Sequence, residues 1–219
     1  MKTIISRIFC FFATVSCFFA CEDNTVDYAL GEYYQNIATV LNDSVYLLDS
    51  GEALYNINYR ANKAFDADKR IFLTYSLEKE KNAPCGHAIL LHGASEITLG
   101  ELKIADKIAI DSLPAHPVRL ESVWVGSHYL NMRFYFDYRS KTHSIGLFAD
   151  DSCLSGDTLH LYFRHNTNQD SPGYPVHLFL SFDLEKVLGK PGGESSKQKC
   201  LQVFVNSSNY ADKSYKFKY

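Results

Sequence analysis

The 219-residue sequence lacks the short motifs that mark common catalytic centres. It contains no GxSxG nucleophile elbow, no P-loop, no HExxH zinc motif and no GxGxxG dinucleotide loop. Its carboxylates are also too scattered to nominate the acid pair of a glycosidase. The sequence therefore predicts a protein that is not an enzyme, with no catalytic residue and no cofactor site.

The sequence has fewer basic than acidic residues. The chain has 22 Lys and Arg against 25 Asp and Glu, and removal of the first twenty residues, which include Lys2 and Arg7, would leave 20 against 25, a net charge of −5. Proteins that bind nucleic acid carry an excess of Lys and Arg to neutralise phosphates. A nucleic-acid partner is therefore not expected.

Cysteines are few beyond the first twenty-one residues, where only Cys85, Cys153 and Cys200 remain. They form no CxxC and no Cys/His spacing typical of zinc, so no metal site is predicted. Three cysteines allow one internal bridge at most. Cys153 and Cys200 are the candidate disulfide, because both lie in the second half; the alternative is that all three are free and buried.

Only one long uncharged apolar run is present, the thirteen residues Ile8–Ala20. It follows the basic residues Lys2 and Arg7 and stops at Glu22. A membrane-spanning helix needs about twenty apolar residues, whereas ~7–15 suit the core of a signal peptide. Residues 1–20 are therefore predicted to be a cleaved signal peptide.

The end of this run, Phe18-Phe19-Ala20-Cys21, resembles the lipobox of bacterial lipoproteins. Cleavage before Cys21 would leave its thiol modified with diacylglycerol. Thr14–Cys17 is a competing lipobox, but cleavage there would leave two phenylalanines on the new N-terminus. In a third interpretation the leader is an ordinary secretory signal, cut after Ala20 to release a chain without lipid. Cys21 is the predicted lipidation site.

The lipid anchor predicts the location of the protein. One acyl chain binds a membrane only marginally, whereas two or more hold it stably. The acidic pair Glu22-Asp23 resembles the signal that sends Bacteroidetes lipoproteins to the outer face of the outer membrane. We expect a protein anchored by lipid in the bacterial outer membrane, with exposure at the cell surface as a hypothesis.

Aromatic residues make up 14% of the chain, which favours β-strands because flat rings pack well on a pleated surface. The clearest strand is His128–Tyr138, in which Leu130, Met132, Phe134, Phe136 and Tyr138 alternate with more polar residues. An all-β fold is predicted.

The strand pattern divides the chain into two domains. After a tether at 21–30, five or six short strands in 31–110 predict a small OB-like barrel. Residues 111–117 contain Pro114 and Pro117 and are the predicted linker, since neither proline can donate to a sheet. About seven strands in 118–219 predict an antiparallel β-sandwich.

Several of these stretches resemble a known family. Trp124–Phe134, Leu161–Asn166 and Ser181–Leu184 look like the C-terminal domain of the NigD-like lipoproteins of Bacteroidetes. Val45–Gly51 and Arg70–Tyr75 are similar to the N-terminal domain of that family. The resemblance implies an OB-like barrel followed by a β-sandwich behind a lipidated cysteine, and it implies no reaction.

Two groups of polar residues deserve comparison with metal sites. His143, His160 and His165 with Asp150 and Asp151 are interpreted as structural, because His160 and His165 would point to opposite faces of one strand. A second group, in the loop after His165, has the alternate spacing that begins a calcium loop, but it lacks the glycine and the closing glutamate. The predicted role of these loop residues is turn formation; they are Asn166, Asn168 and Asp170.

Two functions are compatible with this sequence. The first is a cell-envelope interaction or structural module that presents β-surfaces to another envelope protein. The second is a glycan-binding surface lipoprotein. OB-like barrels often bind oligosaccharides, and several tyrosines that we expect to face outward could stack on sugar rings. These tyrosines are Tyr129, Tyr135 and Tyr162.

Overall fold

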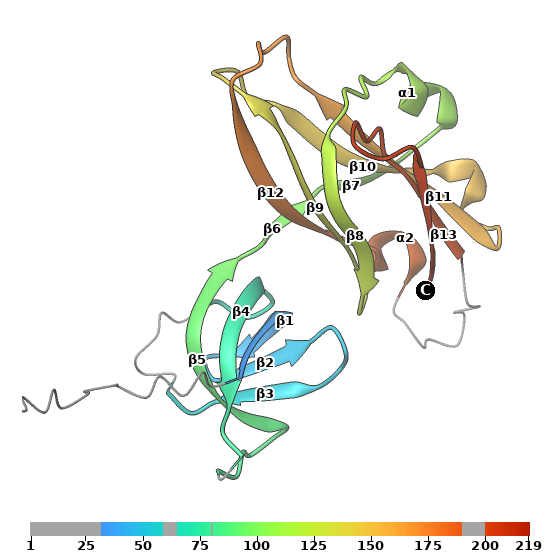
Figure 1. Cartoon of the computed structure of the whole chain (residues 1–219). Coiled ribbons are helices and arrows are strands. Elements are labelled where there is room, and N and C mark those ends of the chain that lie inside the picture. The colour runs from blue at the N-terminus through green and yellow to red at the C-terminus, as the bar shows by residue number, and fades with distance from the viewer. Residues whose placement is uncertain (1–31, 59–64, 80, 190–199) are drawn as a thin grey trace, which may run out of the picture. The chain divides into compact units, whose positions relative to one another are not determined.

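The computed structural model describes residues 32–58, 65–79, 81–189 and 200–219 (Figure 1). The predicted signal peptide, the lipidation site Cys21 and the tether at 21–30 lie outside the described residues. The described part is a closed five-stranded barrel followed by two further sheets that enclose a second core. The all-β class, the OB-like barrel and the sandwich are thus confirmed.

The barrel has the strand order β1-β2-β3-β5-β4, and β4 pairs with β1 to close it. All its pairings are antiparallel except β3 with β5. Alternate residues of β4 point inward, and Ile71 and Leu73 are fully buried. The barrel strands are β1 (Tyr33–Asn42), β2 (Val45–Leu48), β3 (Ala53–Asn56), β4 (Arg70–Leu77) and β5 (His87–Glu96).

The sandwich consists of a four-stranded sheet, β6-β12-β9-β8, and a five-stranded sheet, β14-β13-β11-β10-β7. Antiparallel pairing predominates, but β6 with β12, β7 with β10 and β11 with β13 are parallel. The strands are β6 (Thr98–Gly100), β7 (Leu102–Ala105), β8 (Arg119–Gly126), β9 (Tyr129–Tyr138), β10 (Ser144–Asp150), β11 (Thr158–Asn166), β12 (Tyr174–Asp183), β13 (Cys200–Phe204) and β14 (Ser214–Lys218).

The sandwich core follows from the period of two in its strands. In β9, Leu130, Met132 and Phe134 are fully buried, which confirms the predicted inward face. Phe134 meets Phe163 of the opposite sheet edge to face, with ring centroids 5.1 Å apart. Each such buried side chain contributes about 1.5–3 kcal/mol to folding. This core holds the two sheets together.

The chain changes from barrel to sandwich earlier than the predicted linker at 111–117. Strand β5 ends at Glu96, Ile97 is buried, and β6 already pairs with β12. The segment 111–117 lies inside the sandwich instead of before it, and its His116 N–H donates to the His165 carbonyl of β11 at 2.8 Å. The domain boundary of the structure is therefore near Ile97.

The chain passes from one sheet to the other between β6 and β7. Gly100 ends β6, and a Cβ atom at this position would lie 2.2 Å from the buried ring of Phe182. Only glycine allows this close approach.

Short helices complete the described part: α1 (Lys107–Ser112), α2 (Glu185–Leu188) and the 3₁₀ turn η2 (Asp151–Cys153). Asp106 caps α1 by accepting a hydrogen bond from the Ala109 N–H at 2.8 Å. None of the helices in the described residues is long and apolar enough to cross a membrane.

Candidate functional site

Helix α1 is fixed on the outer face of the five-stranded sheet by Arg164 of β11. The Arg164 Nε donates to the Ile110 carbonyl at 3.0 Å, and its Nη2 lies 3.4 Å from an Asp111 carboxylate oxygen. The Ile110 side chain is fully buried under the helix. This orientation leaves Ile108 on the outer side of α1, where it is 83% exposed.

A shallow groove of about 220 Å³ is lined in part by Leu113 and Pro114, the residues directly after α1. We define the Ile108 surface as Ile108 of α1 and the apolar residues Leu113, Pro114 and Phe148 of this groove. Charged groove residues flank them, namely Glu101, Lys103 and Arg164. Large exposed apolar side chains beside charged ones are typical of a protein-binding surface.

A second groove is lined by aromatic rings. Trp124 lies 5.6 Å from the ring of Phe179, which in turn lies 6.5 Å from the ring of Phe72. Two neighbouring hollows, of about 240 and 410 Å³, share these two phenylalanines together with Gln35 and Arg133. We call this the Trp124 groove. Rings beside amide and guanidinium groups offer the stacking and hydrogen bonds that sugars use.

Asp49 is part of the lining of the Trp124 groove and forms an ion pair with the buried Arg70. Arg70 Nη1 and Nη2 donate to the two Asp49 carboxylate oxygens at 2.6 and 2.9 Å. Asn131 Nδ2 also donates to Asp49, and Ser181 Oγ donates to Asn131 Oδ1 at 2.6 Å. In the sequence, Asp49 appeared only within Val45–Gly51, a stretch similar to the N-terminal domain of the family. Its partners are far apart in the chain, so no local pattern could have linked them.

The structure changes the interpretation of the three tyrosines. Tyr129 is buried beneath the Arg70 guanidinium, whose Cζ lies 4.1 Å from the ring centroid, and burial raises the Tyr129 pKa. Tyr162 is buried as well, stacked on Phe204 at 4.7 Å. The expectation that these two face outward is wrong. Tyr135 is partly exposed, but its ring is stacked on His177 at 4.7 Å.

His143 and His165 form a buried pair, with 2.9 Å between His143 Nδ1 and His165 Nε2. Burial, reinforced by the neighbouring His143, lowers the His165 pKa to about 4. Asp170 Oδ2 lies 3.5 Å from His143 Nε2, the distance of an ion pair and too long for a good hydrogen bond. These contacts agree with the structural role that the sequence predicts for both histidines.

The loop after His165 uses its polar side chains within the protein. Asn166 Oδ1 accepts from the Asn168 N–H at 2.9 Å, and Asn168 Nδ2 donates to the Thr142 carbonyl. Burial alone would raise the Asp170 pKa, but the backbone N–H groups of Arg139 and Ser140 donate to this carboxylate and the pKa falls to about 2. The predicted turn-forming role fits these bonds.

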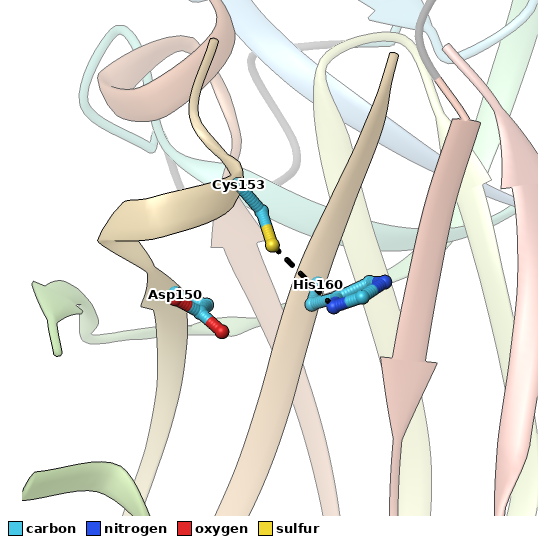
Figure 2. A group of neighbouring side chains, drawn as sticks. All are labelled: Asp150, Cys153 and His160. Atoms are coloured by element: carbon cyan, nitrogen blue, oxygen red, sulfur yellow. Dashed lines mark hydrogen bonds between the residues drawn. The ribbon is translucent and has the colours of Figure 1, made fainter. Parts of the chain in front are cut away.

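Cys85, Cys153 and Cys200 are all free and partly exposed. The predicted Cys153–Cys200 bridge is not formed in the structure. The alternative was that all three thiols are free and buried; they are free, but they are not buried. Cys153 instead faces His160, with 3.5 Å between Sγ and Nδ1, and Asp150 lies beside them (Figure 2). No pattern in the sequence had placed Cys153 beside Asp150 and His160.

Solved structures share this fold. A protein of unknown function from Bacteroides vulgatus has 25% identity, a TM-score of 0.70, and coverage of 86% of this chain and 91% of its own. A NigD-like immunity protein from Bacteroides caccae has 20% identity, a TM-score of 0.60, and coverage of 88% and 99%. A "Putative lipoprotein" from Bacteroides fragilis has 13% identity, a TM-score of 0.57, and coverage of 86% and 96%.

A comparison with curated proteins finds no match. The family described as the NigD-like C-terminal beta sandwich domain matches residues 102–219, which is more than half of the chain and contains β7 to β14. The match agrees with the resemblance found in Trp124–Phe134. The chain therefore belongs to the NigD-like family.

Proposed function

We propose that the protein is a non-enzymatic lipoprotein, anchored through Cys21 in the bacterial outer membrane, that acts as an interaction module of the cell envelope. The leader supports the anchor, because a basic start and a thirteen-residue apolar core precede Ala20-Cys21. The likeness in fold to a structure named "Putative lipoprotein" agrees with this assignment. The acidic pair Glu22-Asp23 favours display at the cell surface.

The Ile108 surface is the observation that carries the interaction role. An isoleucine that is 83% exposed, held outward by a helix that is itself fixed through Arg164, has no role in the core of the protein. Burial of its side chain against a partner would contribute about 1.5–3 kcal/mol. The partner that fits is an envelope protein with an apolar segment for the groove between Phe148 and Pro114.

Fractionation of cells that carry Cys21→Ser tests the anchor. The variant should move from the membrane fraction to the soluble fraction, because its N-terminus carries no acyl chains. Cys17→Ser is the matched control and should remain in the membrane. Retention of the Cys21→Ser variant in the membrane would contradict the anchor, and full protection from protease added to intact cells would contradict surface display.

Chemical cross-linking in intact cells tests the interaction. A specific cross-linked species formed by the unaltered protein should be lost in Ile108→Glu, since a charge at this site opposes burial of the surface. Leu41→Glu changes an apolar residue of the barrel that is also exposed and should keep the species. Equal loss in both variants, or in neither, would reject the Ile108 surface as the binding face.

Glycan binding is a second candidate, favoured by the Trp124 groove. The chain contains a single tryptophan, so its fluorescence reports this groove alone. An oligosaccharide that stacks on the groove should change this fluorescence and raise the melting temperature with the same saturation. A screen of envelope and dietary oligosaccharides without such a paired response would exclude this function in favour of the interaction role.

A further inference from the structure

A single turn of chain brings Asp150, Cys153 and His160 together. Strand β10 ends at Asp150, the turn η2 follows, and β11 returns alongside β10 in antiparallel register. Asp150 Oδ1 caps the turn by accepting from the Ser152 N–H at 3.0 Å and from the Ser152 hydroxyl at 2.6 Å. Because the cap fixes the turn, the Cys153 thiol is directed at β11 (Figure 2).

The imidazole of His160 is held in position by aromatic neighbours. Phe204 and Tyr162 meet it edge to face, with ring centroids 5.6 and 6.5 Å away. In this orientation Nδ1 faces the Cys153 sulfur, and Nε2 points away from it (Figure 2). This arrangement differs from a catalytic Cys-His-Asp triad, in which the carboxylate would orient the ring through the nitrogen opposite the thiol.

The distances agree with tetrahedral coordination of zinc. Bonds of about 2.3 Å to sulfur and 2.0–2.1 Å to nitrogen, at a tetrahedral angle, put these two ligand atoms about 3.6 Å apart. Cys153 Sγ and His160 Nδ1 are 3.5 Å apart. A carboxylate oxygen of Asp150 completes a set of three ligand atoms that lie within 4.8 Å of one another.

We propose that Asp150, Cys153 and His160 form a binding site for a zinc ion, with a water molecule as the fourth ligand. On binding, the Cys153 thiol releases its proton to solvent, the carboxylate is ionised and the imidazole stays neutral. The thiolate and the carboxylate then balance the two positive charges of the ion. A set of sulfur, nitrogen and oxygen ligands suits zinc better than calcium or magnesium, which take oxygen ligands.

The proposal stands independently of the interaction role, because the site uses none of the residues of the Ile108 surface. A second cluster, His128, Asp183 and Glu185, also brings three ligand atoms within 4.8 Å. It contains no thiol, so it lacks the sulfur ligand that favours zinc at the first cluster. A disulfide between Cys153 and Cys200 would remove the sulfur ligand, so zinc binding requires Cys153 in its reduced form.

Titration of the reduced, metal-free full chain with Co²⁺ tests the site. A cysteine thiolate bound to Co²⁺ produces a charge-transfer absorption in the near ultraviolet, and we expect it to saturate at one equivalent. Zn²⁺ added afterwards should abolish the band by displacing cobalt, which binds less tightly to such ligands. Zinc added to the metal-free chain in weak buffer at neutral pH should release about one proton per ion.

Variants identify the ligands. Cys153→Ser should lose both the absorption band and the proton release, whereas Cys85→Ser and Cys200→Ser should keep them. His160→Gln should weaken zinc binding by at least ~10-fold. Asp150→Asn keeps an oxygen that can cap η2 but removes the charge, so it should weaken binding while leaving the melting temperature of the metal-free chain unchanged. His128→Gln controls for the second cluster.

The outcomes separate the proposal from its alternatives. A saturating band that disappears only in the Cys153 variant supports the site. A band that persists in Cys153→Ser, or that is lost in His128→Gln, would overturn the assignment. Absence of a thiolate band at saturating Co²⁺, with circular dichroism showing a folded chain, would overturn the proposal itself.

Discussion

The Asp49 carboxylate accepts two hydrogen bonds from the guanidinium of Arg70, at 2.6 and 2.9 Å, and the Arg70 side chain is completely buried. Tyr129 covers the face of the guanidinium. The backbone approaches closely as well, since a Cβ atom at Gly126 would lie 2.4 Å from Asp49 Oδ2. A buried guanidinium is tolerated only while its charge is balanced, so the stability of the fold depends on the Asp49 carboxylate.

Removal of the Asp49 carboxylate should therefore be costly. Asp49→Ala is expected to lower the free energy of unfolding by about 3–5 kcal/mol, because it leaves an uncompensated buried charge. Urea denaturation at neutral pH would measure this as a lower midpoint. Asp43→Ala, in the exposed turn between β1 and β2, should change stability by less than about 0.5 kcal/mol. A similar midpoint for both variants would show that the pair contributes little.

Acid should destabilise the protein through His165. Its folded-state pKa of about 4 lies below the usual 6.5, so as the pH falls the unfolded chain takes up this proton before the folded one does. The stabilising contribution is complete above about pH 6.5 and is lost as the pH falls towards 4. Melting temperatures recorded between pH 8 and pH 4 should fall across this window.

His165→Gln is the control for the acid transition, because glutamine can keep a hydrogen bond to His143 but does not titrate. The fall in melting temperature between pH 6.5 and pH 4 should be smaller in this variant. Asp170, with a pKa lowered to about 2, adds a further loss only below about pH 3.8. An unchanged profile above pH 4 in the variant would exclude His165 as the cause.

The domain boundary makes a prediction about fragments. Residues 97–219 should unfold cooperatively, because they contain every strand of both sandwich sheets. Residues 118–219 should not, because they lack β6 and β7, which cover the edges of β12 and β10, and they lack the buried Leu102. Thermal melts of the two fragments would decide between the boundary near Ile97 and a linker at 111–117.

Much of the fold was predictable because its signals are local. The period of two in Leu130, Met132 and Phe134 predicted an inward face, and these three side chains are fully buried. Local signals do not show to which sheet a short strand belongs. Thr98–Gly100 pairs with residues about eighty positions later, and its sequence alone carries no mark of that partner.

The sites were less predictable for the same reason. Arg70 and Asp49 are twenty-one residues apart, and no sequence pattern around either residue indicates the other as its partner. Cys153 and His160 are closer, but their meeting depends on η2, a turn that is set by Asp150 and Ser152. The strand periodicity correctly separated His160 from His165, which have different neighbours. It could not show which side chain would approach from the turn.

The late position of β13 and β14 has a consequence for the order of folding. Leu201 and Val203 of β13 are fully buried, and β13 lies between β11 and β14 in the five-stranded sheet. The sandwich core therefore stays incomplete until the last twenty residues are available, whereas the barrel has all its strands before residue 97. The barrel can therefore form first, while the sandwich waits for contacts between segments that are distant in the chain. A chain cut before residue 200 would thus have a complete barrel joined to a sandwich that lacks β13 and β14, and the open edge of β11 would favour aggregation.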